Sequence, residues 1–421
     1  MCAAALSGRM KTIKDSVHDH IEVGGVARDL LDTPAVQRLR NVVQLGTSSL
    51  VYPSANHTRF EHSLGVYHLA GEALDHLGVE GRNAKRVKAA AILHDVGHGP
   101  FSHNLEPLTH RRTGKYHDDV HELFERGEVG SVLREHDLSP SGVADLVAGD
   151  GKYGQIVSGE LDVDRMDYLV RDAHHTGVPY GTIDHGRLVR ELTFDRDDDL
   201  VLDEGNVQTA ESLLVARALM IPTVYNHHVT RISKAMLRRG AERLLEVTEL
   251  DAEELRRMDD PAFLVALRQT AETRSFARRF DERNLHKRAL WAELEDTPAS
   301  LLALEHADVR GYELEIAERA GVDERDVILD VPGEPSMTES STHVLVNGEA
   351  RVLHEQSPLV DALRAANRAQ WRLGVYAPAE ETDAVGSAAA DVLGLDLDGA
   401  LVSEVRTGLQ ETLGSFQGEE S

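Results

Sequence analysis

Residues 92–103 have the sequence ILHDVGHGPFSH, in which His94 and Asp95 are adjacent and two more histidines follow closely. The preceding residues 84–94 are rich in alanine and apolar side chains after a basic start, which predicts a helix. The glycines and the proline that follow predict its end. We therefore expect the His-Asp pair at the end of a helix, where an irregular backbone can present several side chains to one point.

Two other stretches complete a set of metal donors. Residues 60–66, FEHSLGV, contain His62, and residues 161–172, LDVDRMDYLVRD, contain Asp164. Two imidazoles and two carboxylates form a mixed nitrogen and oxygen donor set that suits a divalent transition metal. A lone histidine is more often an ordinary core or surface residue, but four such residues in glycine-punctuated motifs favour a metal site. We call His62, His94, Asp95 and Asp164 the quartet.

The order His, His-Asp, Asp resembles that of the HD superfamily of phosphohydrolases. The flanking residues resemble its deoxynucleoside triphosphate (dNTP) triphosphohydrolase branch, which includes the SAM-and-HD-domain dNTPase and bacterial dGTPase-like enzymes. The stretches that carry the likeness are RFEHSLGVYHLAG at 59–71, LHDVGHGPFSH at 93–103, DVDRMDYLVRDAHH at 162–175, RLRNVVQLGTSSLVYP at 38–53 and ARALMIPTVYNHHVTR at 216–231. The resemblance spans residues 10 to 240 and includes no separate N-terminal SAM domain.

The resemblance implies that the quartet binds a divalent metal, and it leaves Fe, Mn, Zn, Ni and Mg open. Magnesium carried by the substrate triphosphate is a further option. The residues that match a cluster near the scissile phosphate are His98, His103 and His117. Imidazole donates or accepts a proton near neutral pH, and His103 is the favoured proton donor to the departing nucleoside oxygen.

Substrate contacts are also implied by the resemblance. Three arginines match positions that contact the triphosphate: Arg59, Arg165 and Arg217. Guanidinium suits this task because it is permanently charged and forms forked bonds to phosphate oxygens. The residues that match the surroundings of the sugar and base are Gln44, Leu45, Tyr168, Asp172 and Tyr225. In this family a tyrosine near C2′ and an aspartate on the 3′-hydroxyl favour deoxyribose, but Asn226 replaces a glutamine of some relatives, so the base preference stays open.

The implied reaction is attack of a water activated by the metal on the α-phosphorus of a dNTP, which releases deoxynucleoside and triphosphate. One alternative is another HD phosphohydrolase, namely a nucleoside monophosphatase or a cyclic-nucleotide phosphodiesterase. Another alternative is a nucleotide sensor that does not cleave its ligand. Relatives often form dimers or tetramers and some need a nucleotide activator, so we expect a homo-oligomer and leave the activator open.

Composition sets the frame for this site. The chain has 421 residues, 41% of them hydrophobic, which favours a globular main domain with an appended lobe. The net charge is −27, and only 8 of the 45 basic residues are lysine. Acid excess with few lysines predicts a halophile whose cytoplasm is rich in salt, where charge repulsion is screened. The same balance argues against broad binding to nucleic acid.

Targeting signals are absent from the sequence. Cys2 is the only cysteine, so no intrachain disulfide is expected and a reducing compartment is favoured. The chain has neither an apolar run of about 18 residues nor a signal-peptide core near its start. We expect a cytoplasmic protein that does not enter membranes.

The expected fold is mainly α. Residues 1–300 are predicted to form an HD-type helical catalytic domain with a polar insert near 104–160, made of short helices over the site. Within this domain we expect helices at 33–43, 162–175 and 207–220, a small hairpin at 192–206, and charged helices at 245–300.

The remainder is predicted as a small α+β lobe at 301–380 and an acidic tail at 381–421. Asn347 and Gly348 predict a two-residue hairpin turn, and residues 358–371 predict an amphipathic helix. The tail is expected to be partly disordered by composition, or to form one docking helix with Leu401, Val405, Leu409 and Leu413.

Overall fold

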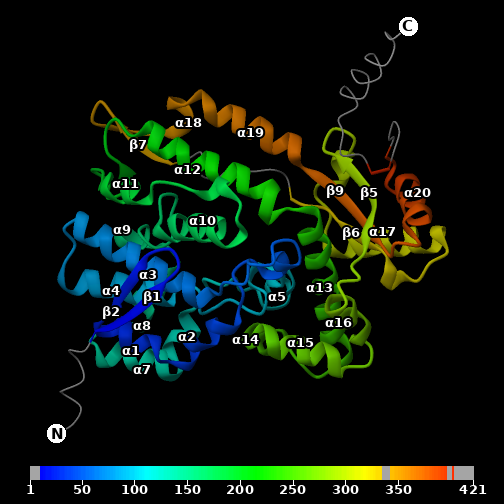
Figure 1. Ribbon diagram of the computed structural model, residues 1–421, viewed down its shortest axis with the longest axis horizontal. Helices are drawn as coiled ribbons and strands as arrows, with labels where there is room; N and C mark the ends of the chain where they lie inside the picture. Colours follow the sequence, from blue (N-terminus) through cyan, green and yellow to red (C-terminus); the bar gives the residue numbers. More distant parts are fainter. Residues whose placement is uncertain (1–9, 334–341, 396–400, 403–421) are drawn as a thin grey trace. The chain divides into compact units, whose positions relative to one another are not determined.

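The computed structural model describes residues 10–333, 342–395 and 401–402. The chain forms two compact units, Met1–Arg283 with Met337–Arg364 and Asn284–Ser336 with Ala365–Ser421. Helices dominate the first unit, and apart from the β1–β2 hairpin at its start the sheets are formed by strands from Leu192 onward (Figure 1). The predicted fold class, a helical core with a small C-terminal α+β region, is confirmed. The predicted domain boundaries at 300 and 380 stay a prediction.

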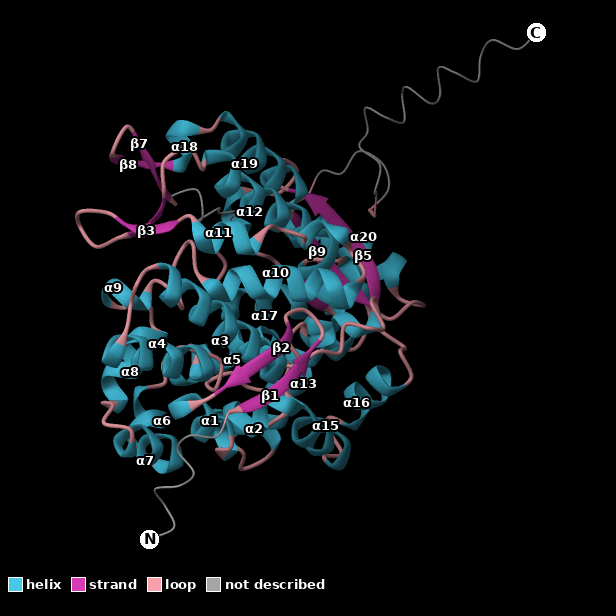
Figure 2. Ribbon diagram, turned by 60° about the vertical axis from the view of Figure 1, so that its left-hand side comes forward, coloured by secondary structure: helices cyan, strands magenta, loops and turns pink. Residues whose placement is uncertain are grey.

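The first unit contains most of the helices and the first two strands. These elements are β1 (Lys11–Asp15), β2 (Asp19–Val23), α1 (Gly25–Leu31), α2 (Pro34–Arg38), α3 (Arg59–His76), α4 (Gly81–Leu93), α5 (Glu106–Thr113), α6 (His121–Glu125), α7 (Gly127–Glu135), α8 (Pro140–Val147), α9 (Gly151–Gly154), α10 (Val163–Thr176), α11 (His185–Arg190), α12 (Val207–Met220), α13 (His228–Val247), α14 (Ala252–Arg257), α15 (Asp260–Gln269) and α16 (Arg274–Asp281). α3 packs against both α4 and α10 (Figure 2). These three helices carry the quartet.

Local sequence explains where the two long site helices begin. α3 starts at a capping box, in which Glu61 Oε2 accepts the backbone N–H of Thr58 at 2.6 Å. α10 starts after Asp162, whose carboxylate accepts the N–H of Arg165 at 2.7 Å, and ends at Gly177 in the left-handed conformation. The start of each helix, and the end of α10, are therefore fixed by local residues.

The beginning of the chain differs from the sequence expectation. The paired strands β1 and β2 form an antiparallel hairpin that we did not expect. The helix predicted at 33–43 is α2 followed by a 3₁₀ turn at Leu39–Asn41, because the chain bends before Val43 pairs with Thr58. Residues 162–175 and 207–220 are helical as predicted, and α12 continues into a π-helical turn at Ile221–Tyr225 that includes Pro222.

The segment 104–160 consists of short helices, as expected, but it also contributes to the core. Val129 and Leu133 of α7, together with Val143 and Val147 of α8, are buried in the main hydrophobic cluster. α8 packs directly against α4. α7 and α8 therefore support α4, the helix that precedes His94, although the segment 104–160 is polar in sequence.

A four-stranded sheet lies in the first unit. Its strand order is β3 (Leu192–Phe194), β4 (Leu200–Leu202), β7 (His343–Val346) and β8 (Glu349–Val352). The hairpins predicted at 192–206 and around Asn347 are both present, and β4 joins them by a parallel pairing with β7. α18 (Leu353–Gln356) and α19 (Pro358–Gln370) follow, so the predicted amphipathic helix is also confirmed.

The second unit is a small three-stranded sheet with two helices. The antiparallel strand order is β5 (Lys287–Glu293), β9 (Arg372–Ala377) and β6 (Ile328–Asp330), with α17 (His306–Ala320) and α20 (Thr382–Leu393). The prediction of helices throughout 245–300 is wrong at β5. Residues 287–293 form a strand because they pair with β9, with a register shift near Arg288. Leu290 and Ala292 of this strand are buried.

Some predictions fall on residues outside the described part of the chain. Cys2 and most of the predicted tail helix, including Val405, Leu409 and Leu413, belong to these residues. Within the described residues, no helix combines the length and the apolar character needed to span a membrane.

Candidate metal centre and active site

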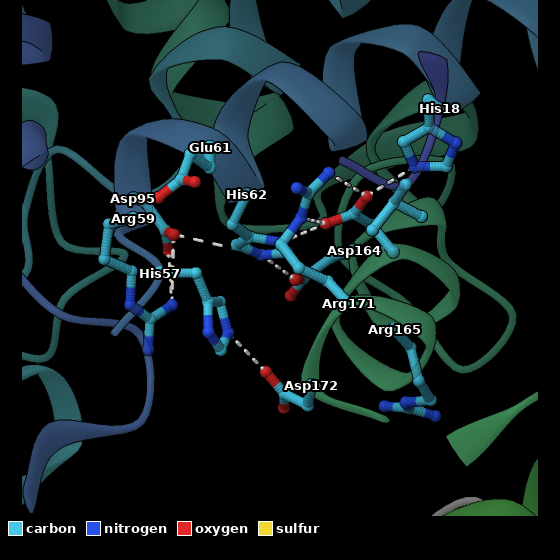
Figure 3. A network of polar contacts seen from close by, with 12 residues as sticks. His18, His57, Arg59, Glu61, His62, Asp95, Asp164, Arg165, Arg171 and Asp172 are labelled. Carbon is cyan, nitrogen blue, oxygen red and sulfur yellow. Dashed lines mark hydrogen bonds and ion pairs between the residues drawn. The ribbon is translucent and has the colours of Figure 1, made fainter. Parts of the chain in front are cut away.

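The structure brings the four members of the quartet together. His62 lies on α3, His94 and Asp95 directly follow α4, and Asp164 lies in the first turn of α10. The two histidine Nε2 atoms are 3.3 Å apart, and Asp164 Oδ1 lies 2.7 Å from Nε2 of His62 and 3.8 Å from that of His94. Ligand atoms of His62, His94 and Asp95 all lie within 4.8 Å of one another. Figure 3 shows the His62 side chain between Asp95 and Asp164.

Both imidazoles are oriented by a partner on their other nitrogen. Nδ1 of His94 donates to the carbonyl of Ala91 at 2.8 Å, and Nδ1 of His62 donates to Asp167 Oδ2 at 2.8 Å. A carbonyl or carboxylate on the second ring nitrogen is the usual support of a metal-ligating histidine, because it fixes both tautomer and ring orientation. The Nε2 atoms are thereby left for a cation.

Asp167 belongs to a buried ion network that we define as Asp15, His18, Asp167 and Arg171. Arg171 is fully buried and bonds both Asp167, at 2.8 and 3.0 Å, and Asp15, at 2.9 and 3.2 Å. Nε2 of His18 lies 2.6 Å from Asp167 Oδ1 (Figure 3). This network fills the space over Gly65, where an added Cβ would overlap the Asp167 carboxylate and lie 2.5 Å from Arg171 Nη2.

The charge balance of the quartet fits a cation. Burial by itself lowers the pKa of His62, but hydrogen bonds to Asp164 and Asp167 outweigh it and raise that pKa to about 10. The carboxylates of Asp164 and Asp167 that raise this pKa also favour positive charge at the site. A divalent metal at the Nε2 atoms would supply that charge, and the nitrogen and oxygen donors suit a transition metal.

Arg59 contacts the quartet directly. This buried guanidinium donates from Nη1 to both Asp95 oxygens, at 2.9 and 3.0 Å, and from Nε to Ser102 Oγ at 3.0 Å. Ser102 Oγ in turn donates to the carbonyl of Val43. Burial raises the pKa of the Asp95 carboxyl, but the charges of Arg59 and His94 hold it well below its usual range. Arg59, predicted as a triphosphate contact, thus also holds a metal-ligand carboxylate ionised.

The three predicted catalytic histidines form a second group beside the quartet, and Glu106 completes it. Nδ1 of His103 and Nδ1 of His117 donate to the two Glu106 oxygens, at 2.7 and 2.6 Å. The ring of His98 stacks on His117, with centroids 4.1 Å apart, and its Nε2 lies 3.2 Å from Asp95 Oδ1. We call His98, His103, Glu106 and His117 the histidine cluster.

Sequence reasoning assigned no role to Glu106 or Asp167, although a signal existed for both. Glu106 follows His103 by three residues, and Asp167 follows Asp164 by three residues on α10. A carboxylate at this spacing shares a helical face with its predecessor. An acidic residue at this spacing from a proposed ligand or catalytic histidine therefore marks a candidate orienting group.

The predicted sugar residues extend from the quartet along one helix. Asp164, Tyr168 and Asp172 recur every four residues on α10 and so share one face. Arg217 on α12 donates to the Tyr168 hydroxyl at 3.2 Å, and the hydroxyl of Tyr225 donates to Asp172 Oδ2 at 2.9 Å. The structure therefore connects four of the predicted substrate residues to the helix that carries a metal ligand.

The other predicted substrate residues are less tightly grouped. Gln44 is buried, and its backbone N–H donates to the carbonyl of His57, whereas Leu45 follows it before a 3₁₀ turn. Arg165 donates to the backbone carbonyls of Glu160 at 2.7 Å and Gly159 at 3.4 Å. Its side chain lies away from Asp95 in Figure 3. Its triphosphate role stays a prediction.

Residues beyond the motifs hold the loop that carries His98 and His103. Phe101 and Ser102 have positive φ values of 57° and 56°, a conformation that costs free energy in residues other than glycine. Asp260 of α15 accepts the N–H of Phe101 at 2.6 Å and that of Val43 at 3.0 Å. Arg38 donates to the carbonyl of His98 at 2.6 Å. No motif pointed to Asp260, and Arg38 opens the family-like stretch at 38–53 but was given no role.

Comparison with known protein families gives two matches. The model of the HD domain matches residues 59–172, and the model of the HD associated region matches residues 183–404. The first range contains the quartet and the histidine cluster, and the second contains Arg217 and Tyr225.

Several curated proteins are similar to this chain. An uncharacterised protein of Methanocaldococcus jannaschii is 34% identical over 380 residues, which are 88% of this chain and 80% of that protein. The deoxynucleoside triphosphate triphosphohydrolase SAMHD1 of Homo sapiens is 28% identical over 66% of this chain and 54% of its own length. Its homolog of that name in Dictyostelium discoideum is 31% identical over 54% of this chain and 48% of its own length. The match thus spans about half of each triphosphohydrolase.

Two solved structures are also similar. A hypothetical protein from Aquifex aeolicus superimposes with a TM-score of 0.72 at 28% identity, covering 90% of this chain and all of that one. A phosphohydrolase from Bacteroides thetaiotaomicron gives a TM-score of 0.69 at 27% identity, covering 87% of this chain and all of that one. Both likenesses extend over most of the described residues.

Proposed function

Because this chain belongs to the family of HD-domain proteins that carry an HD-associated region, we propose that it is a metal-dependent phosphohydrolase that cleaves dNTPs into deoxynucleoside and triphosphate. The observation that carries the proposal is the single face of α10, on which Asp164, Tyr168 and Asp172 follow one another. A metal ligand and two candidate sugar contacts therefore lie on one rigid element. The similarity to proteins named deoxynucleoside triphosphate triphosphohydrolase supports this choice.

The quartet would hold the divalent metal, which supplies Lewis-acid polarisation of a phosphoryl oxygen and a bound water of lowered pKa. Arg59 keeps Asp95 ionised through its two hydrogen bonds and adds fixed positive charge beside the site. Arg217, which is hydrogen-bonded to Tyr168, is the proposed contact to the phosphate chain, because guanidinium forms forked bonds to phosphate oxygens. These arginines would stabilise negative charge that develops on the phosphate oxygens.

The histidine cluster would supply the proton for the leaving group. Glu106 holds Nδ1 of His103 as a donor, so the other nitrogen of that ring is available for proton transfer. The His103 side chain is 53% exposed, whereas those of the quartet's histidines are buried, so a substrate can approach it. Its proposed role is donation of a proton to the departing nucleoside oxygen from Nε2 of the protonated ring, which returns to the neutral form with its Nδ1 proton still hydrogen-bonded to Glu106.

A substrate panel tests the proposal. Purified protein would be supplied with dNTPs, NTPs, dNMPs and cyclic nucleotides, each with Mn²⁺, Fe²⁺, Zn²⁺, Ni²⁺ or Mg²⁺, at low and at high salt. Chromatography that resolves triphosphate, pyrophosphate and phosphate would follow the products. We expect triphosphate from dNTPs with a transition metal. Phosphate from dNMPs, or opening of cyclic nucleotides, would instead identify a monophosphatase or a phosphodiesterase, and binding of dNTP without any product would identify a sensor.

Other expectations from the sequence remain proposals. They are the identity of the metal, a nucleotide activator, a homo-oligomeric state, a cytoplasmic location and a halophilic source. The panel at low and high salt addresses the last of these, because a protein adapted to salt should lose activity as the ionic strength falls.

A further inference from the structure

We infer that His57, which lies outside the motifs and the predicted site, is a positioning residue that sets the sugar-facing groups of the site. The inference rests on the proposed function, because it assumes that Asp172 or Tyr225 contacts the sugar. His57 acts through Asp172, and by doing so it makes the site prefer a nucleotide that carries a 3′-hydroxyl. Figure 3 shows the His57 side chain beside Arg59 and hydrogen-bonded to Asp172.

The side-chain contact of His57 is buried and direct. Nε2 of His57 lies 2.8 Å from Asp172 Oδ1, and both side chains are almost fully buried. Since an ionised carboxylate can only accept, the imidazole donates this bond. The second oxygen of Asp172 accepts the Tyr225 hydroxyl at 2.9 Å. His57, Asp172 and Tyr225 thus form a chain in which the first residue orients the carboxylate and the carboxylate orients the phenol.

Asp172 needs such an orienting partner because of its place in the fold. It is 1% exposed, so a substrate hydroxyl can meet at most one edge of its carboxylate. A carboxylate that rotates about its last torsion would present a different edge, since such torsions have broad minima. Two donors on opposite oxygens fix this angle. A carboxylate oxygen with one donor retains a lone pair for a substrate hydroxyl.

The backbone of His57 links the same chain to the predicted base contact. The carbonyl of His57 accepts the N–H of Gln44 at 2.9 Å, Val43 pairs with Thr58, and the N–H of Arg59 donates to the carbonyl of Val42 at 2.9 Å. Residues 42–44 and 57–59 therefore form a short paired segment. One residue thus fixes Gln44 by its main chain and Asp172 by its side chain.

The ring of His57 is itself held in place. It stacks on the ring of His175, with centroids 4.4 Å apart and an interplanar angle of 19°. His175 is held by Ser16 Oγ, 3.1 Å from its Nε2, and by Ser54 Oγ, which donates to its carbonyl at 2.6 Å. A substitution of His57 keeps the backbone hydrogen bonds of that residue intact, so variants at this position test the imidazole alone.

The experiment compares His57→Leu and His57→Gln with the wild type on dATP and on 2′,3′-dideoxy-ATP, which lacks the 3′-hydroxyl. Leucine fills much of the space without a donor, whereas the amide nitrogen of glutamine reaches near the position of Nε2. The matched control is His175→Leu, which removes the stacked ring and keeps the hydrogen bond. Metal content and melting temperature are measured for every protein.

We expect His57→Leu to lower kcat/KM for dATP by about tenfold or more, because a hydrogen bond to a charged group is lost. The kcat/KM for the dideoxy analogue should change by less than about threefold. His57→Gln should restore most of the preference, and His175→Leu should retain most of it. Equal losses on both nucleotides, or glutamine no better than leucine, would show a merely structural role and overturn the inference. The same conclusion follows if the wild type shows no preference for the 3′-hydroxyl.

Failure of the proposed function has a different signature. A wild-type protein that releases no triphosphate from dATP defeats the proposed reaction, and the same comparison is then made by equilibrium binding of the two nucleotides in the presence of Ca²⁺. A binding preference for dATP that disappears in His57→Leu and returns in His57→Gln supports the inference without the reaction. A wild type that binds neither nucleotide overturns both.

Discussion

The quartet and the histidine cluster meet in the motif at 92–103, which holds two members of each group, yet the surroundings of the two groups differ. Each quartet histidine is buried, with one nitrogen fixed by Asp167 or by the carbonyl of Ala91. In the histidine cluster, His103 and His117 share one carboxylate, Glu106, and His103 reaches solvent. Buried and fully oriented donors suit a permanent cation, whereas an accessible imidazole suits exchange of protons with a substrate. The difference predicts that damage to the quartet affects metal content and activity together, and damage to the cluster affects activity alone.

The largest effect is expected from His94→Ala. Removing one of two nitrogen donors should abolish metal binding and lower dNTP hydrolysis by about a thousandfold or more, because Lewis-acid stabilisation worth several kcal/mol is lost. Metal analysis and product chromatography on the same sample measure both effects. The control His20→Ala removes an exposed histidine of β2 outside the quartet. Normal turnover in His94→Ala would contradict the metal mechanism.

A smaller effect is expected from His103→Ala. Loss of a general acid typically costs about a hundredfold or more in kcat, and the metal content should stay that of the wild type because the quartet is untouched. The matched control is His121→Ala, which removes an exposed histidine whose Nε2 lies 3.5 Å from Asp145. Parallel loss of metal in His103→Ala would abolish the distinction between the two groups.

Asp167→Asn should weaken metal affinity by about tenfold to a hundredfold, the usual effect of losing a partner that orients a ligating histidine. Competition with a metal chelator measures the affinity, and activity at saturating metal should recover in part. Asp29→Asn is the control, since Asp29 pairs with His136 near the surface. Unchanged metal affinity in Asp167→Asn would show that His62 needs no carboxylate support.

Arg217 is not a member of the quartet and is proposed to contact the triphosphate. Arg217→Ala should therefore raise KM for dATP by about tenfold, with less change in kcat. Arg217→Lys should be intermediate, since lysine keeps the charge and loses the forked geometry. Steady-state kinetics with dATP, alongside metal analysis, checks this. A fall in kcat alone would move Arg217 from substrate binding to the chemical step.

The smallest effect concerns acid stability. Burial raises the pKa of Asp167, but Arg171 and the hydrogen bonds of His18 and His62 lower it well below 3.8. A carboxyl with a lowered folded pKa contributes stability that is present above its unfolded value and lost as pH falls through the folded one. We expect little change between pH 7 and 5 from this group and a loss below about pH 4. The free energy of unfolding is measured with denaturant at each pH for the wild type and for Asp167→Asn. The difference between the two proteins gives the part of the loss that comes from Asp167.

Much of the site was predictable because metal and acid-base chemistry restricts residue types. His62, His94, Asp95 and Asp164 are recognisable by type and order, and α10 by its helical spacing, so the structure brings them together as expected. Glu106 and Asp167 were within reach of the same argument, because they lie three residues after a predicted site residue. They received no role because a three-residue spacing does not by itself show that a carboxylate bonds a particular histidine.

Other positions could not be predicted from local sequence. Asp260 meets the loop of Phe101 from more than 150 positions away, and His57 meets Asp172 from 115 positions away. β5 was predicted as helix because its pairing partner β9 lies far along the chain. Strand formation there depends on that partner, since strand preference reflects cross-strand packing more than local propensity.

The sequence by itself determined the helical class and predicted the candidate metal donors and the candidate catalytic histidines, because each depends on residue type and on spacings within one helix or loop. The tertiary structure alone decided which groups orient these residues: the buried ion network behind His62, Asp260 beneath the strained loop, and His57 on Asp172. Orientation in a buried site comes from hydrogen bonds between segments distant in sequence, and no local pattern records those partners.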